Sequence, residues 1–169
     1  MKTWHFIVAV ATLGFAPNGA ALAACEPFTA NIPTDGRHFE YSDVNGDGQV
    51  DPGDMVVGRD TLYDKDGGKI GRLFATVVIN AVDDSGGATK FADTQIYALP
   101  DGGFFAFAEI DRGRIDVHEI ASESFKDNNL KPTTLQIIGG TGGYAKADGT
   151  VVMSFTDGVG KLEINLSCK

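Results

Sequence analysis

The chain has 169 residues, a formal net charge of −9 and two cysteines. This length is enough for one domain with a real hydrophobic core. The negative balance argues against nucleic acids and anionic membrane surfaces as partners, because both would repel an acidic protein.

The first 24 residues have the pattern of an export signal. Lys2 supplies a positive charge, and residues 6–16 form an apolar run too short to span a bilayer. Ala21-Leu22-Ala23 fits a signal-peptidase site. We therefore expect a signal peptide at 1–24 and one mature domain at 25–169, secreted or periplasmic.

The two cysteines allow two interpretations. Leu22-Ala23-Ala24-Cys25 resembles a bacterial lipobox, which would place a lipid on Cys25 and anchor the protein to a membrane. Cys168 lies almost at the other end of the mature domain. In an exported protein one such pair most simply forms a disulfide, and the sequence favours this over the lipid.

Short apolar runs that end in glycine turns recur through the mature domain. Such spacing is typical of an antiparallel all-β domain with hairpin connections. The run at 104–108 is apolar on both faces, which suits a closed barrel with one wall covered by a partner subunit or a loop. The strands we expect span 37–42, 55–62, 69–82, 89–99, 103–111, 113–120, 133–138, 149–156 and 160–167.

Residues 43–54 have the spacing of a calcium loop of the EF-hand type. Oxygen-bearing residues recur at the ligand positions, and Gly48 stands where the chain must turn sharply. Because the flanks have strand patterns, we expect a structural Ca²⁺ that clamps the loop rather than a switch. The expected ligands are Asp43, Asn45, Asp47, Gln49 (through its carbonyl), Asp51 and Asp54.

Two further segments carry a family resemblance. The first is Gly53-Asp-Met-Val-Val-Gly-Arg-Asp-Thr-Leu-Tyr-Asp64, followed by Gly68-Lys-Ile-Gly71. The second is Ile137-Ile-Gly-Gly-Thr-Gly-Gly-Tyr-Ala-Lys-Ala-Asp-Gly149. Together they resemble the allene oxide cyclase and dirigent superfamily, over residues 37–167. The resemblance implies an eight-stranded antiparallel β-barrel, often trimeric, with a hydrophobic pocket inside and no organic cofactor.

The strand at 38–42 has two opposed interpretations. Alternation turns Phe39 and Tyr41 inward and Glu40 outward. The resemblance implies the reverse, because plant allene oxide cyclases turn a Glu and a hydrogen-bonding residue into the pocket at the positions of Glu40 and Ser42. Asp60 stands where those enzymes hold an Asn. On this basis Glu40 is the candidate catalytic group, with Ser42 and Asp60 as its hydrogen-bonding neighbours.

We therefore expect an exported barrel that binds a small hydrophobic molecule, with cyclisation or isomerisation as the candidate activity. One alternative is a dirigent-like or ligand-carrying barrel without catalysis. Another is a calcium-stabilised structural surface protein with a solid core. An interior filled by Phe105, Phe107, Met153 and Phe155 would exclude both binding functions.

Overall fold

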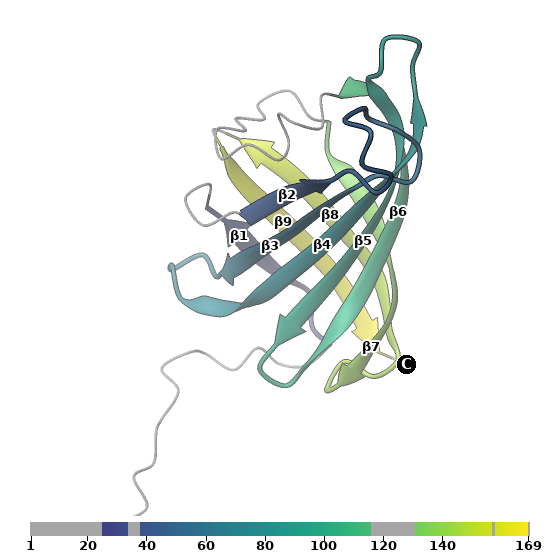
Figure 1. Ribbon diagram of the computed structural model, residues 1–169. Coiled ribbons are helices and arrows are strands. Elements are labelled where there is room, and N and C mark those ends of the chain that lie inside the picture. The colour runs from purple at the N-terminus through teal and green to yellow at the C-terminus, as the bar shows by residue number, and fades with distance from the viewer. Residues whose placement is uncertain (1–24, 34–37, 116–130, 157, 169) are drawn as a thin grey trace, which may run out of the picture.

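In the described part of the chain, all regular secondary structure is β-strand. The computed structural model describes residues 25–33, 38–115, 131–156 and 158–168 (Figure 1). The strands are β1 (Phe28–Ile32), β2 (His38–Ser42), β3 (Met55–Tyr63), β4 (Lys69–Val82), β5 (Ala88–Leu99), β6 (Gly102–Ile115), β7 (Thr133–Gly142), β8 (Ala147–Thr156) and β9 (Val159–Cys168).

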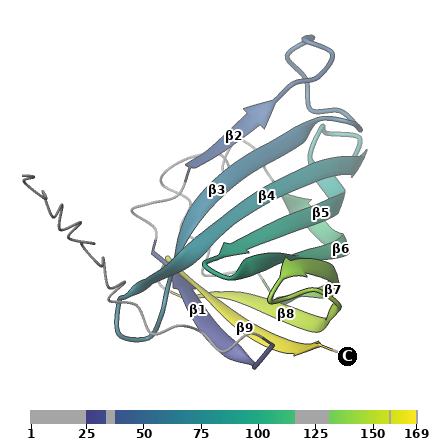
Figure 2. The same ribbon diagram turned by 90° about the horizontal axis from the view of Figure 1, so that it is seen from below.

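The strands close into a barrel. Neighbours in the sheet follow the order β1-β9-β8-β7-β6-β5-β4-β3-β2 and are antiparallel, and Asn31 of β1 pairs with Tyr63 of β3 to close the ring. β2 pairs along the other part of the same β3 edge, so β1 and β2 share one of eight strand positions. Figure 2 shows this ring from below. The predicted eight-stranded antiparallel barrel is confirmed.

Most expected strands are present, with three differences. β1 was not predicted. It is a five-residue strand between Pro27 and Pro33, and prolines this close argue against a strand when only the sequence is considered. β6 runs without a break where two strands were expected, and the remainder of the second, 116–120, lies outside the described residues. β7 continues through the glycine segment to Gly142 instead of ending at 138.

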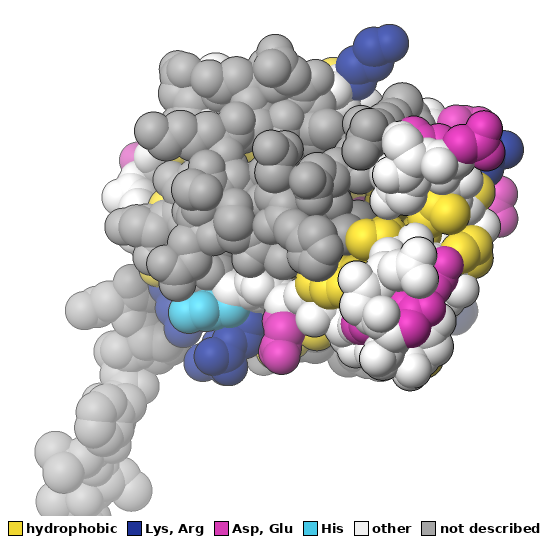
Figure 3. Space-filling model, turned by 45° about the horizontal axis from the view of Figure 1, so that its top comes forward, with side chains coloured by type: hydrophobic (Ala, Val, Ile, Leu, Met, Phe, Trp, Pro, Cys, Tyr) yellow, Lys and Arg dark blue, Asp and Glu magenta, His cyan; other side chains and the backbone are white. Residues whose placement is uncertain are grey.

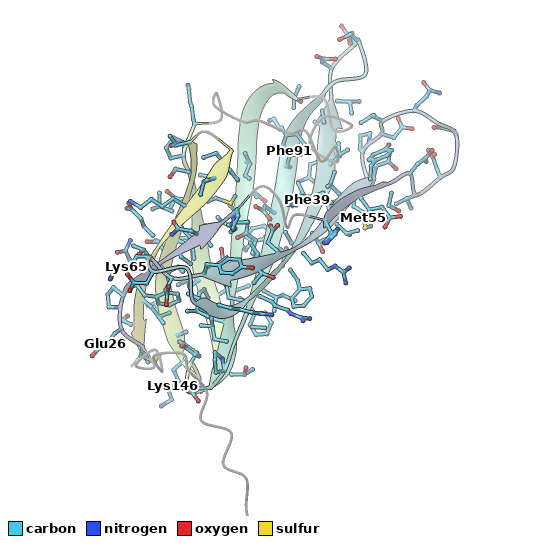
Figure 4. The ribbon with its side chains drawn as sticks, turned by 90° about the vertical axis from the view of Figure 1, so that its left-hand side faces the viewer. Glu26, Phe39, Met55, Lys65, Phe91 and Lys146 are labelled. Carbon is cyan, nitrogen blue, oxygen red and sulfur yellow. A yellow bond between two sulfur atoms is a disulfide. The ribbon has the colours of Figure 1, made fainter. Side chains whose placement is uncertain are left out.

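The interior contains two hydrophobic clusters. The larger includes Tyr97 and Phe104, whose stacked rings have centroids 4.5 Å apart. The smaller is made of Val56, Ile79, Ala88 and Phe91, with Phe39 packed against it. Figure 4 shows Phe39 and Phe91 on the same half of the barrel, the end that carries the long β2–β3 loop.

The apolar run of β6 is divided between the two faces of the barrel wall. Phe104, Ala106 and Ala108 are buried inside the barrel, whereas Phe105 and Phe107 alternate with them and face outward, half-buried. The interior is therefore not filled by Phe105 and Phe107. Two alanines on the inner face leave more room than two phenylalanines would.

A disulfide joins the two ends of the described barrel. Cys25 and Cys168 are bonded, with their Cα atoms 5.5 Å apart. This confirms the favoured pairing and uses the Cys25 sulfur that a lipid would need. A disulfide indicates an oxidising, non-cytosolic compartment. The predicted signal segment 1–24 lies outside the described residues, and within them no helix is long and apolar enough to cross a membrane.

Candidate functional site

The orientation of β2 follows from a glycine on its neighbour. Phe39 pairs with Gly58 of β3, and a Cβ at Gly58 would lie 2.3 Å from the Phe39 ring. The missing side chain therefore makes room for this ring beside the smaller cluster. With Phe39 inward, Glu40 faces outward and is exposed. Alternation predicted this correctly, and the inward Glu40 implied by the resemblance is wrong.

The three predicted catalytic residues are not brought together. Asp60 is 5% exposed and lies on the inner face of β3. Glu40 is on the outer face of β2, and Ser42 is half-buried at the end of that strand, where it pairs with Met55. Only Asp60 of the three points into the barrel. Catalytic roles for Glu40 and Ser42 stay predictions that this arrangement does not support.

The calcium prediction is wrong. The carboxylate oxygens of Asp43 accept the backbone N–H groups of Gly46 and Gly48, at 2.6 and 2.7 Å. Asp47 accepts the N–H of Gln49 at 2.8 Å, and the Asn45 amide donates to Asp51 at 3.1 Å.

These hydrogen bonds turn the side chains of the loop toward its own backbone and toward one another. Within the described ranges no three acidic, histidine or cysteine side chains converge on a metal position. The ligand set of Asp43, Asn45, Asp47, Gln49, Asp51 and Asp54 is therefore corrected to a hydrogen-bonded loop. Spacing in a sequence does not distinguish an oxygen available to a metal from one that accepts an N–H of its own loop.

Asp54 closes this loop. It is 2% exposed, and its carboxylate accepts hydrogen bonds from the N–H groups of Val44 and Asp51, both at 2.9 Å, and from the Tyr41 hydroxyl at 2.6 Å. Burial by itself would raise the pKa of Asp54, but these three donors together lower it below its usual value. Backbone bonds between Ile79 and residues 53 and 54 then attach the loop to β4.

A stripe of polar residues inside the barrel was not predicted. Asp93, Gln95 and Tyr97 alternate on the inner face of β5, and all three are buried. The Gln95 amide donates to Asp93 at 2.9 Å, and the Tyr97 hydroxyl donates to the Gln95 carbonyl oxygen. The only signal in the sequence is that Asp93 and Gln95 share a face with Phe91 and Tyr97.

The stripe has a fixed polarity. Burial, and then the charge of Asp93, raise the pKa of Tyr97 well above its ordinary value. Tyr97 therefore stays a neutral phenol and a hydrogen-bond donor. Because its proton goes to the Gln95 oxygen, the amide nitrogen of Gln95 faces Asp93. The carboxylate of Asp93 is thus the acceptor at the end of a chain of two hydrogen bonds along β5.

Small side chains surround the middle of this stripe. Gln95 pairs with Ala75 of β4 on one side and with Ala106 of β6 on the other. Asp93 pairs in the same way with Ala108. The Met153 sulfur of β8 lies 4.0 Å from the Gln95 amide nitrogen, so this side chain reaches across the interior. The stripe can hold the polar group of a molecule whose remainder contacts apolar walls.

The fold and this site define a small closed β-barrel with hydrogen-bonded polar groups inside. No protein-family model matches the sequence, and no curated protein is detectably similar to it. Solved structures do resemble it. Pyocyanin demethylase aligns with a TM-score of 0.61 and 22% sequence identity, over 83% of this chain and 99% of that chain.

Two further structural neighbours are cyclisation enzymes. AbnU, described as an exo-specific intermolecular Diels-Alderase, aligns with a TM-score of 0.55 and 18% identity, over 88% of this chain and 98% of its own. A nonspecific heme-binding cyclase that catalyses a [4 + 2] cycloaddition has the same TM-score and identity, and the chain spans 64% of its length. These likenesses show the fold. The heme-binding neighbour also runs against the expectation that barrels of this kind use no organic cofactor.

Proposed function

We propose that the barrel binds a small hydrophobic molecule beside the stripe of Asp93, Gln95 and Tyr97 and promotes its cyclisation or rearrangement. The observation that carries this proposal is a hydrogen-bonded polar stripe inside a mostly apolar barrel. Burying such groups costs free energy that a purely structural core avoids. A few placed polar groups in an apolar surround are typical of ligand sites.

Each part of the stripe has a role in the proposed chemistry. Tyr97 and Asp93 fix the Gln95 amide from both sides, so the site needs little reorganisation when the ligand binds. The Asp93 carboxylate stabilises an electron-poor intermediate of the bound molecule. The apolar walls hold a flexible chain in one folded conformer, which removes much of the entropic barrier to ring closure.

The comparisons support this class of function without identifying the ligand. Two of the fold neighbours are described as catalysts of cycloaddition. The glycine segment 137–149 carries the resemblance to allene oxide cyclases and dirigent proteins, which also act on hydrophobic intermediates. The export pattern at 1–24 and the disulfide support a location outside the cytosol.

Binding is tested with the neutral fluorescent probe N-phenyl-1-naphthylamine and the mature chain 25–169. We expect Ala75→Leu, which adds volume beside Gln95, to weaken probe binding by about tenfold or more through steric exclusion. Thr94→Leu is the matched control, because Thr94 is exposed on the outer face of the same strand. Circular dichroism verifies that both variants fold.

Solvent extraction of the purified protein, followed by mass spectrometry, identifies any molecule that co-purifies. The proposal predicts a hydrophobic molecule in the wild type and its loss in Ala75→Leu. Equal probe binding by wild type and Ala75→Leu would place the probe outside the barrel. If the wild type binds no probe and its solvent extract contains no hydrophobic molecule, the results would favour a structural protein with a solid core.

A further inference from the structure

A buried hydroxyl inside the barrel has no hydrogen-bond partner. Thr133, the first residue of β7, is 8% exposed and shares the inner face of that strand with Leu135 and Ile137. Within the described part of the chain no hydrogen bond reaches its Oγ1 atom. A buried polar group without a partner costs free energy, so folded proteins retain few of them and each one calls for an explanation.

The polar stripe contains a second group with only a weak partner. The Gln95 amide nitrogen carries two N–H bonds and donates to Asp93 at 2.9 Å. Its other neighbour among the described residues is the Met153 sulfur, at 4.0 Å. A thioether is a weak acceptor, and this distance is long even for a contact to sulfur. One N–H of the amide is therefore available to an oxygen of a bound molecule.

Met153 separates these two groups. It pairs with Thr133 across β7 and β8, so the two side chains are neighbours on the inner face. From there its sulfur extends to Gln95 on β5. Met153 is half-buried, so solvent reaches it, whereas the other two residues are buried. Because methionine is unbranched and flexible, a ligand can move it aside and reach both polar groups.

We propose that Gln95 and Thr133 bind two separate oxygen groups of one hydrophobic ligand, and that Thr133 selects for the second group. This selection rests on the proposed function, since it concerns the ligand of the same barrel interior. Gln95 donates to an acceptor oxygen of a carbonyl, an ether or a hydroxyl. The Thr133 hydroxyl can donate or accept, so it fits the same groups. The apolar middle of the ligand contacts the walls of the barrel.

Charge indicates that both oxygen groups are neutral. The Gln95 amide nitrogen lies 2.9 Å from the Asp93 carboxylate, which would repel an anionic group placed beside it. Thr133 begins β7 at the end of the barrel that carries the β2–β3 and β4–β5 loops. Figure 3 shows acidic side chains on the loops at this end, with hydrophobic side chains between them. An anion is therefore opposed on its approach as well as at the stripe.

Competition with N-phenyl-1-naphthylamine on the mature chain 25–169 measures the binding of matched ligands. The ligands are 1-octanol, 1-decanol and 1-dodecanol and the α,ω-diols of the same lengths, whose flexible chains sample different separations. Thr133→Val removes the hydroxyl and keeps the branched shape. We expect it to weaken the best-fitting diol by about fivefold to tenfold. The matching alcohol should change by less than about twofold, because its single hydroxyl still reaches Gln95.

Thr134→Val is the matched control, since Thr134 is the next residue and is exposed on the outer face of β7. It should bind both ligand series like the wild type. Because the Thr133 hydroxyl has no partner in the free protein, Thr133→Val should melt at the temperature of the wild type or above it. A lower melting temperature with unchanged diol binding would overturn the proposal, because the hydroxyl would then bind a structural partner such as a buried water molecule.

The outcomes separate this selection from the proposed function. If the wild type binds the probe and both ligand series, but Thr133→Val changes diol and alcohol equally, the barrel still binds hydrophobic molecules and the role of Thr133 is overturned. If decanoate competes as well as 1-decanol, the preference for neutral oxygen groups is overturned. A wild type that binds neither the probe nor any alcohol would overturn both proposals together.

Discussion

Tyr97 is the residue at which the packing of the barrel and its polar stripe meet. Its ring stacks on Phe104, which in turn contacts Tyr144 at 6.0 Å between centroids. Its hydroxyl donates to Gln95 and so fixes the amide that faces Asp93. One side chain thus belongs to the larger hydrophobic cluster and also sets the polarity of the candidate site.

Tyr97→Phe should lower the free energy of unfolding by about 1 to 3 kcal/mol. The ring stays in its stack, but the buried Gln95 carbonyl loses its donor. Urea denaturation measures the change. Tyr144→Phe is the matched control, because Tyr144 is also buried but its hydroxyl makes no hydrogen bond among the described residues. Equal losses in the two variants would mean that the Gln95 contact adds nothing.

At the scale of elements, the β2–β3 loop is held by Asp54 instead of a metal ion. The pKa of this carboxyl in the folded protein lies below its ordinary value of 3.8. The ionised form therefore stabilises the fold at pH values above the unfolded pKa, and this contribution is lost as pH falls through the lower folded pKa.

Asp54→Asn should be less stable than the wild type at pH 7, by about 1 to 3 kcal/mol, because an amide nitrogen replaces one acceptor oxygen among three donors. The difference should shrink as the pH falls below 4, because the unfolded wild type then binds a proton at Asp54, and it should be lost as the pH falls through the lower folded pKa. Urea denaturation at several pH values measures it. Asp84→Asn, at an exposed carboxylate of the β4–β5 loop, should change little. A constant difference across pH would contradict the role of the charge.

The hairpin strands could be predicted because their signals are local. In β9, Leu162, Ile164 and Leu166 alternate with polar residues and are all buried. β1 could not be predicted in this way, because five residues between prolines become a strand only by pairing with β9 from the far end of the chain. Its partner is therefore not visible in its own sequence.

The candidate site was missed for a related reason. Alternation assigns polar residues to the outer face of a strand, and Asp93 and Gln95 break that rule on the inner face. Phe91 and Tyr97 share this face and are buried, so the face points into the barrel. This becomes clear only from the three-dimensional structure, in which the sheet closes on itself. Such breaks of a local rule are expected at functional sites.

At the scale of the whole molecule, the disulfide ties the start of the domain to its end. Cys25 precedes β1 and Cys168 ends β9, and the two residues are 143 positions apart. The bond thus closes nearly the whole domain into one loop, next to the pairing of β1 with β9. In the chain-entropy account a loop of this length restricts the unfolded state by about 5 kcal/mol.

Reduction of the disulfide should therefore lower the free energy of unfolding by up to about 5 kcal/mol. Urea denaturation with and without a thiol reductant measures the loss. The double variant Cys25→Ser with Cys168→Ser should match the reduced wild type and should not respond to reductant. Because β1 keeps its hydrogen bonds to β9, the reduced protein should still give the far-ultraviolet spectrum of a β-protein at low urea. Coincident unfolding curves for the oxidised and reduced wild type would show that the pairing of the two ends already holds the barrel closed without the covalent link.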